Sequence, residues 1–152
     1  MPTFETRRHV PYTPAQMYDL VADVARYPEF LPLVEGLAVL GRDVDAGGRT
    51  VLHCEMRVGY GMLHERFTTR VTLDPAHRIV HARGNDGPFH KIENRWQLLR
   101  ASGGANVDFM IDYDFRNPML GLLIGSMFDS AFRKFTAAFE DRARAIYGPP
   151  VA

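Results

Sequence analysis

Six histidines are the residues best able to bind a metal ion in this chain of 152 residues. His53 and Glu55 alternate on one predicted strand, so their side chains share a face and could chelate an ion together. A third ligand is not indicated at a suitable spacing. The alternating Leu52, Cys54 and Met56 define the apolar face of the strand, which leaves the pair in solvent. The sequence therefore predicts no metal site.

The single cysteine, Cys54, is the candidate for a thiol nucleophile. Its own strand face carries no base that could activate the thiol, so we expect a small buried core residue. The sequence also contains no G-x-S-x-G turn, no glycine-rich phosphate loop after a strand and no H-E-x-x-H helix. We therefore predict that the protein is not an enzyme. One cysteine cannot form an intrachain disulfide, which is typical of a reducing compartment such as the cytoplasm.

Two polar residues, Glu65 and Asn94, fall on strand faces that are otherwise apolar. The inward-facing residues are expected to be Leu63, Glu65, Phe67, Thr69, Val71 and Leu73 in one strand and His90, Ile92, Asn94, Trp96 and Leu98 in another. An ionised carboxylate buried alone is costly, so an inward Glu65 must be paired, protonated or hydrated. The alternative is a position at a strand end, or a bulge that turns Glu65 outward. Both residues are candidates for polar groups that line a cavity.

The balance of charged residues excludes a strong overall electrostatic field. Lysine plus arginine and aspartate plus glutamate both number 18, so the net charge is 0, and we predict no DNA partner. Only local clusters could bind RNA phosphates or lipid headgroups, and they are Arg7-Arg8 and the group Arg133, Lys134, Arg142 and Arg144. Acidic residues lie close to the second cluster in the sequence, which favours an ordinary mixed-charge helix face.

Seven segments of alternating apolar and polar residues predict the strands that position these side chains. They are Phe4–Val10, Leu37–Arg42, Thr50–Tyr60, Met62–Leu73, Arg78–Gly84, His90–Arg100 and Asn106–Arg116. Short turns rich in glycine, proline, aspartate and asparagine separate the last six, which indicates an antiparallel meander. In the last segment Val107, Phe109 and Ile111 alternate with Asp108 and Asp112. One face of the sheet is therefore covered and the other is in water.

A short helix is predicted between the first two strands. Thr13 is a good N-cap, Pro14 suits the first helical position, and Gln16 completes a capping box. Pro28 predicts the end of this helix, followed by a helical turn or bend as far as Pro32.

The C-terminal segment predicts one long amphipathic helix, which begins at Pro118 after the cap Asn117 and stops at Gly148. One face carries Phe128, Phe132, Phe135 and Phe139, and the helix is about 45 Å long at about 1.5 Å per residue. We expect an α+β fold in which the sheet curls around this helix. A curved sheet and a straight helix diverge at one end, which leaves a cavity between them.

We expect a single domain over residues 1–148 and a short tail at 149–152, because 152 residues suit one core. The first residues lack the apolar run of a signal peptide. The longest charge-free stretch is the twelve residues Asn117–Phe128, shorter than the roughly 18 needed to cross a bilayer. These features predict a soluble cytoplasmic protein.

Four motifs occur along nearly the whole chain. They are Tyr27-Pro-Glu-Phe-Leu-Pro32, Gly87-Pro-Phe-His-Lys-Ile-Glu-Asn-Arg-Trp96, Val107-Asp-Phe-x-x-x-Tyr-Asp-Phe-Arg-Asn117 and Ala138-Phe-x-x-Arg-Ala143. With them the chain resembles the START-like coenzyme Q-binding protein family, which includes mitochondrial coenzyme Q carriers and bacterial ribosome-association toxins. The resemblance implies a helix-grip fold: a curved seven-stranded antiparallel sheet around a long C-terminal helix, with one or two short helices after the first strand. It also implies a tunnel for a lipophilic ligand, and ubiquinone as that ligand.

We predict a non-catalytic domain that binds ubiquinone or another polyprenyl lipid and supports respiratory electron transport, with no resident cofactor. An apolar tail gains free energy on entering an apolar cavity. The ring oxygens need only one or two donors, which Asn94, Trp96, Tyr113 or a protonated Glu65 could supply. The predicted ligand-binding residues are Phe30, Leu31, Glu65, Phe67, Asn94, Trp96, Phe109, Tyr113, Met127, Phe128 and Phe132.

Apolar segments that could lie at the surface suggest a membrane as a partner, and the family resemblance suggests the ribosome. The charge-free Pro118–Phe128 turns, with Phe30, Leu31 and Leu33, could form an apolar mouth that touches a membrane transiently, so that the protein would lie peripherally at the inner membrane. Ordinary core packing is the alternative for these residues. One rival function is binding of the large ribosomal subunit, which the neutral charge disfavours. The other is polyketide cyclase-like catalysis, for which the fold alone is no argument.

Overall fold

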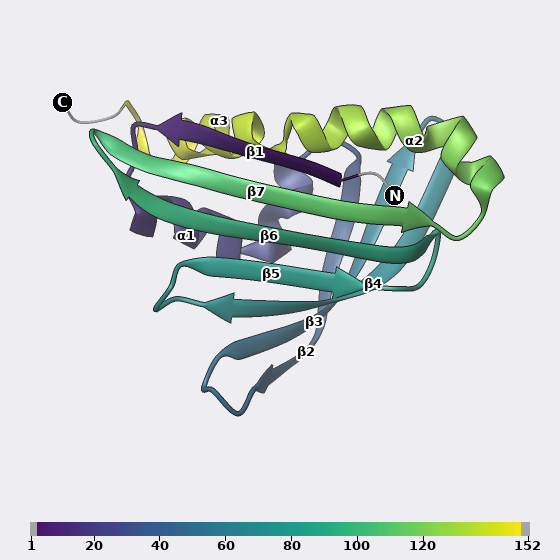
Figure 1. The fold of residues 1–152 in the computed structure, drawn as a ribbon, viewed down its shortest axis with the longest axis horizontal. Helices are drawn as coiled ribbons and strands as arrows, with labels where there is room; N and C mark the ends of the chain where they lie inside the picture. The colour runs from purple at the N-terminus through teal and green to yellow at the C-terminus, as the bar shows by residue number, and fades with distance from the viewer. Residues whose placement is uncertain (1–2, 150–152) are drawn as a thin grey trace.

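The computed structural model describes residues 3–149, which form a seven-stranded antiparallel sheet and its covering helices (Figure 1). The strands are β1 (Thr3–Val10), β2 (Val34–Val44), β3 (Thr50–Tyr60), β4 (Leu63–Asp74), β5 (Ile79–Gly84), β6 (Phe89–Ala101) and β7 (Gly104–Phe115). Their order across the sheet is β1-β7-β6-β5-β4-β3-β2. The predicted strands and the antiparallel meander are confirmed.

The first helix, α1 (Pro14–Ala22), begins where the sequence predicts it. The Thr13 hydroxyl accepts from the Gln16 N–H at 3.1 Å, and the Gln16 side-chain oxygen accepts from the Thr13 N–H at 3.0 Å. The capping box is therefore complete. The helix ends before Pro28, however, because a separate 3-10 helix, η1 (Val24–Glu29), already contains that proline. The predicted helical turn thus starts earlier than expected, and it carries the chain into β2.

The C-terminal segment forms two helices, α2 (Pro118–Arg133) and α3 (Phe135–Tyr147). Between them the Lys134 N–H donates to the Ala131 carbonyl at 3.0 Å, three residues back, which is the tighter pattern of a 3-10 turn. The prediction of one continuous helix is therefore wrong at this residue. The aromatic stripe continues across the break, since the ring centroids of Phe132 and Phe135 lie 5.4 Å apart. No proline or glycine at the break marks it in the sequence.

The core lies between the sheet and the helices. α2 and α3 follow one another along the sheet in Figure 1, and α1 packs against α3 and against β5, β6 and β7. Along β7 every second residue is buried, among them Val107, Phe109 and Tyr113, as the alternation predicts. Phe139 of α3 is fully buried. The expected α+β arrangement, a curved sheet around the C-terminal helical segment, is confirmed.

A β-bulge at the start of β6 changes which side chains face inward. The register with β7 shifts between Phe89 and Lys91, so that Phe89 is fully buried and His90 is exposed. The sequence prediction that His90 faces inward is therefore wrong, because the extra residue reverses the alternation. From Ile92 to Trp96 the predicted inward face is confirmed.

The chain ends close to the end of α3. Gly148 follows that helix with a positive φ of 78°, as suits a glycine at this position. Most of the predicted tail, residues 150–152, lies outside the described residues, and the single-domain boundary at 148 stays a prediction. Within residues 3–149 no helix is both long enough and apolar enough to cross a membrane.

Candidate ligand-binding cavity

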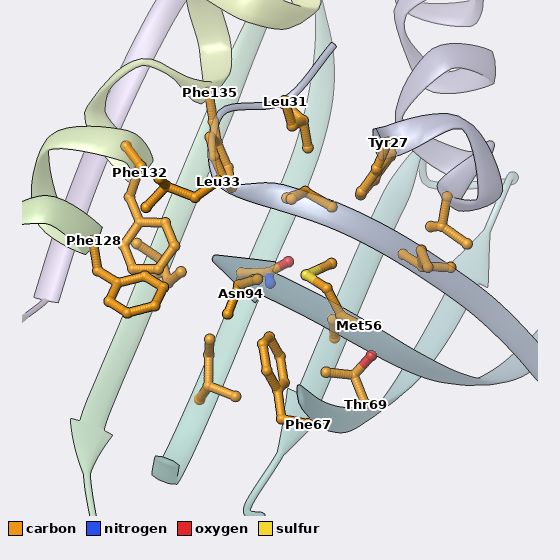
Figure 2. Close-up of a pocket in the computed structure, with 18 of the residues that line it drawn as sticks. Tyr27, Leu31, Leu33, Met56, Phe67, Thr69, Asn94, Phe128, Phe132 and Phe135 are labelled. Carbon is orange, nitrogen blue, oxygen red and sulfur yellow. The ribbon is translucent and has the colours of Figure 1, made fainter. Parts of the chain in front are cut away.

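A largely apolar cavity lies between the inward face of the sheet and the helical side of the molecule (Figure 2). Strands β2 to β7 supply one side of its lining, while η1 and the segment Leu31–Leu33 supply another. The third side comes from Phe128, Ala131 and Phe132 of α2 and from Phe135, the first residue of α3. The helix break at Lys134 therefore lies beside the cavity, with lining aromatic rings on both sides of it.

Aromatic rings form much of this lining and contact one another. On the helical side the ring centroids of Phe128 and Phe132 are 5.9 Å apart. On the sheet side Trp96 of β6 and Phe109 of β7 lie side by side, with ring centroids 4.2 Å apart. Such pairs stabilise the fold beyond the burial of their area, so these walls are well defined. A flat apolar ring could be held between the two sides.

Few polar groups face the cavity. The amide of Asn94 and the hydroxyl of Thr69 point toward its interior from neighbouring parts of the sheet (Figure 2). The Tyr27 ring also contributes to the lining, but its hydroxyl donates to the Val21 carbonyl. Burial raises the pKa of Tyr27, so the phenol stays protonated at neutral pH. The site thus offers an amide and an aliphatic hydroxyl, which can hydrogen-bond a carbonyl oxygen.

A smaller recess adjoins the cavity toward the β3–β4 hairpin. Leu33, Val58 and Phe128 line both spaces, so these three side chains form the wall between them. Glu65 and Met127 line the recess and not the cavity itself. Glu65 keeps the inward phase of β4 and is partly exposed.

The structure brings together seven of the eleven predicted ligand-binding residues in the cavity lining. They are Leu31, Phe67, Asn94, Trp96, Phe109, Phe128 and Phe132. Two others, Glu65 and Met127, lie in the adjoining recess.

The remaining two, Phe30 and Tyr113, lie outside both linings. The Phe30 ring packs edge-on against Phe139, with centroids 5.0 Å apart, and the guanidinium of Arg142 covers it. The Tyr113 ring lies edge-on to the lining residue Phe132, with 5.1 Å between centroids. Tyr113 therefore packs against a cavity residue without lining the cavity, and Phe30 packs in the core against Phe139.

Several lining residues were not among the predicted ones. Thr69 shares the inward face of β4 with Phe67, so the alternation already indicated its position. Phe135 belongs to the predicted aromatic stripe, and spacing alone does not distinguish a cavity wall from core packing. Leu33 was expected at an apolar mouth and lines the cavity instead, with a left-handed backbone at φ of 65°. Such a conformation is uncommon for a branched residue and costs about 1 kcal/mol or more.

The cavity is narrow in this conformation. The centre of a water molecule has about 60 Å³ of space within it, which is room for a few waters at most. A ring with an isoprenoid tail needs more volume than this. Ligand entry therefore requires the lining side chains to move, and the shared wall of Leu33, Val58 and Phe128 is where movement would join the cavity to the recess.

Cys54 and the histidines do not add chemistry to the site. Cys54 is buried, as predicted. His53 contacts Asp43 at 3.0 Å on the exposed face of the sheet, instead of sharing an ion with Glu55. Within the described part of the chain, no three His, Cys, Asp or Glu side chains are grouped so that they could hold a metal.

We expect Cys54 to be unreactive in the folded protein. Burial raises the pKa of its thiol to about 11, so almost no thiolate is present at pH 8, and the sulfur is also inaccessible. The measurement is the rate of reaction with a thiol reagent at pH 8, with and without denaturant. The native rate should be at least a hundredfold lower than the denatured rate. Equal rates would contradict the burial of Cys54.

The charge clusters predicted from the sequence carry their own counter-ions. Arginine–carboxylate contacts join Arg7 to Asp108 at 2.6 Å, Arg8 to Glu140 at 2.7 Å, Arg133 to Asp129 at 2.9 Å, Arg142 to Glu29 at 2.5 Å and Arg144 to Glu140 at 3.4 Å. The mixed-charge interpretation of these helix and strand faces is therefore supported.

Comparisons with known proteins agree with this architecture. The family model described as polyketide cyclase/dehydrase and lipid transport matches residues 10–140. The ribosome association toxin RatA of Pseudomonas aeruginosa is 34% identical, with 91% of this chain and 93% of that one covered. The mitochondrial coenzyme Q-binding protein COQ10 homolog B of Xenopus laevis is 28% identical, with 88% and 54% covered.

A solved structure is similar over the full length. The solution structure of the 18 kDa protein CC1736 from Caulobacter crescentus is 32% identical, covers 98% of this chain and 100% of its own, and superposes with a TM-score of 0.79. The family model covers most of the chain, and the fold and the apolar cavity suit its description. The chain therefore belongs to the polyketide cyclase/dehydrase and lipid-transport family, and to its START-like members.

Proposed function

We propose that this protein binds and carries an apolar ligand in the cavity, and that the ligand is a polyprenyl quinone such as ubiquinone. The observation that carries the proposal is the cavity lining, in which aromatic and aliphatic groups surround the polar ends of Asn94 and Thr69. A polyprenyl quinone has a matching distribution of polarity, with two carbonyl oxygens on one ring and an apolar tail. Burial of that tail is favourable by about 25 cal/mol per Å².

The polar groups suit the quinone ring. The Asn94 amide can donate to a ring carbonyl, and the Thr69 hydroxyl can donate to the same or the opposite oxygen. Trp96 lies two residues from Asn94 on the same face of β6 and, with Phe109, offers an apolar surface to the ring. In this arrangement the ring lies against the sheet, and the tail extends between the α2 aromatic residues toward the recess.

The same groups favour binding over catalysis. Amide and aliphatic hydroxyl groups do not exchange protons readily at neutral pH, and Tyr27 is held protonated by burial. Glu65, the carboxylate that the sequence suggested as a cavity-lining group, lines the recess instead of the cavity. The relative from X. laevis has a name that describes coenzyme Q binding, which supports the quinone over a polyketide substrate. Our proposal is therefore a non-catalytic carrier that supports respiration.

We expect quinone binding to quench the fluorescence of Trp96, the only tryptophan of the chain, because its side chain lines the cavity. Affinity should increase with the number of isoprene units until the tail fills the available channel, since each buried CH₂ contributes about 0.8 kcal/mol. Titration with quinones of increasing tail length measures this. A polyprenyl alcohol of the same length, which lacks the ring, should bind more weakly. Affinity that is independent of tail length would contradict the proposal.

A second candidate function is association with ribosomes, which the name of the P. aeruginosa relative favours. The arginines that the sequence offers for RNA are largely paired with carboxylates, so they add little free positive charge for phosphate groups. The cavity, by contrast, has the composition that an apolar ligand requires. We therefore place ligand binding first.

A further inference from the structure

Four large apolar side chains are exposed at one end of the molecule. Met62 is 99% exposed, Leu122 is 81%, Leu123 is 70% and Met119 is 61%. Met62 lies in the β3–β4 turn, and the other three lie in the first turns of α2, which extend beyond the end of β7 (Figure 1). We call these four residues the apolar tip. Exposed apolar groups gathered in this way are unusual on a protein that has no partner at that surface.

The two parts of the apolar tip belong to one surface. Leu63, which follows Met62, lines the recess together with Ile124 and Met127 of α2. The hairpin turn and the helix are thus neighbours across the recess, and Met62 and Leu123 directly precede the recess residues Leu63 and Ile124 in the chain. The recess in turn shares the wall residue Phe128 with the main cavity. The recess, which also contains the Glu65 carboxylate, therefore lies between the exposed tip and the main cavity, and the wall of Leu33, Val58 and Phe128 separates it from the proposed ligand site.

The helix that carries most of the apolar tip has no charged residue until Asp129. Ile124 and Phe128 of this helix are buried and pack in the hydrophobic core. Leu122 and Leu123 lie off the face of these two residues and are not needed for the core. Core packing therefore does not explain their apolar character.

Cations border the apolar tip. The exposed Arg116, directly before α2, donates to the carbonyls of Asn85 and Phe89 at 2.7 and 3.3 Å. Arg57 and Arg66 are direct cross-strand partners on the β3–β4 hairpin, and both are exposed. A Glu55 carboxylate oxygen lies 4.0 Å from the Arg66 guanidinium and offsets part of this charge, which leaves a net positive charge on the three side chains.

We propose that the apolar tip inserts into the surface of a bilayer with anionic headgroups, where the protein takes up or releases its ligand. The proposal rests on the ligand-binding function above, because a polyprenyl lipid dissolves in membranes and the tip lies beside the recess that adjoins its site. The bordering arginines suit anionic phosphate groups at the headgroup level. The apolar tip protrudes and is formed by a helix start and a hairpin turn. A fluid lipid surface can adapt to this shape, whereas a protein partner would need a groove of complementary shape.

The experiment is flotation of the full chain with phosphatidylcholine vesicles that contain or lack phosphatidylglycerol. Wild type should float with the anionic vesicles. The double variant L122Q/L123Q should lose binding by about tenfold or more, since two leucines no longer enter the apolar layer. The matched control is L40Q/I146Q, because Leu40 and Ile146 are 64% and 53% exposed but lie in β2 and α3, away from the tip. This control should bind as wild type does.

A second variant tests how much the arginines contribute to vesicle binding. R57Q/R66Q should bind the anionic vesicles more weakly and should remove most of the difference between the two vesicle types. Three results would overturn the proposal: no flotation of wild type, equal loss in L122Q/L123Q and in L40Q/I146Q, or dimerisation of wild type in solution that L122Q/L123Q abolishes. The last result would assign the tip to a second copy of the chain.

The test also separates this proposal from the ligand-binding function. Quenching of Trp96 by a short-tailed, water-soluble quinone reports on the cavity without any vesicle. L122Q/L123Q should retain that quenching with unchanged affinity, because neither residue lines the cavity. If wild type floats but shows no quenching, the ligand proposal fails and membrane insertion stands. If quenching is present but flotation is absent, the reverse holds.

Discussion

Phe139→Ala is expected to lower the free energy of unfolding by about 3–5 kcal/mol, the usual loss for a buried aromatic side chain that leaves a cavity. Phe139 is fully buried in α3. Its ring contacts Tyr27, Phe30 and Trp96, with centroids 5.4, 5.0 and 4.8 Å away. These rings come from η1, the following turn and β6, so one substitution removes a contact that joins three parts of the chain. Urea denaturation followed by circular dichroism measures the change.

Phe128→Ala provides the comparison for this experiment. Phe128 is also buried, but it lines both the cavity and the recess, so part of its surface already faces space. Its removal should cost less stability than the removal of Phe139 and should weaken quinone binding more. Equal destabilisation by both substitutions, without a separate effect on affinity, would mean that the helical segment fills a solid core.

Ala131→Leu should abolish quinone binding, with a loss of affinity of a hundredfold or more. Ala131 is buried and lines the cavity from α2. The larger side chain would project into a cavity in which the centre of a water molecule has only about 60 Å³ of space, so it would exclude the ring. Stability should change by less than about 2 kcal/mol, because the added methyl groups fill a void and cause only limited overpacking. Trp96 quenching measures the affinity.

Ser130→Leu is the matched control, since it introduces the same side chain one residue earlier at an exposed position of α2. Binding in this variant should equal that of wild type. If Ala131→Leu binds quinones normally, the ligand does not occupy this cavity.

Much of the fold was predictable because its signals are local. Alternation located the strands, and Thr13 with Gln16 located the start of α1, since both depend on neighbouring residues alone. The break at Lys134 and the bulge at Phe89 were not predictable. Each results from how a segment fits against a partner distant in the sequence, and neither leaves a proline or glycine at the critical residue.

The site was predictable to a similar degree and for the same reason. Asn94 and Phe67 were found because strand alternation fixes the face on which they lie. Phe30 was placed in the site because of its motif, yet its ring turns toward Phe139. Leu33 was expected at an apolar mouth and not in the cavity lining, because its direction depends on a left-handed backbone that a leucine does not signal.

Because the helix is interrupted at Lys134, α2 and α3 can change independently during evolution. α3 is anchored to distant parts of the chain: Arg142 contacts Glu29, and the Tyr12 hydroxyl donates to the Gly148 carbonyl at 2.7 Å. The contacts of α2 with the sheet are mainly between aromatic rings, together with the guanidinium of Arg133, which lies 4.5 Å from the ring centroid of Phe4 in β1. Apolar substitutions among the cavity-lining residues of α2 can therefore reshape what enters the cavity while the polar contacts of α3 are kept. Selection acting on two separately anchored helices is one route by which a single scaffold acquires new ligands among its descendants.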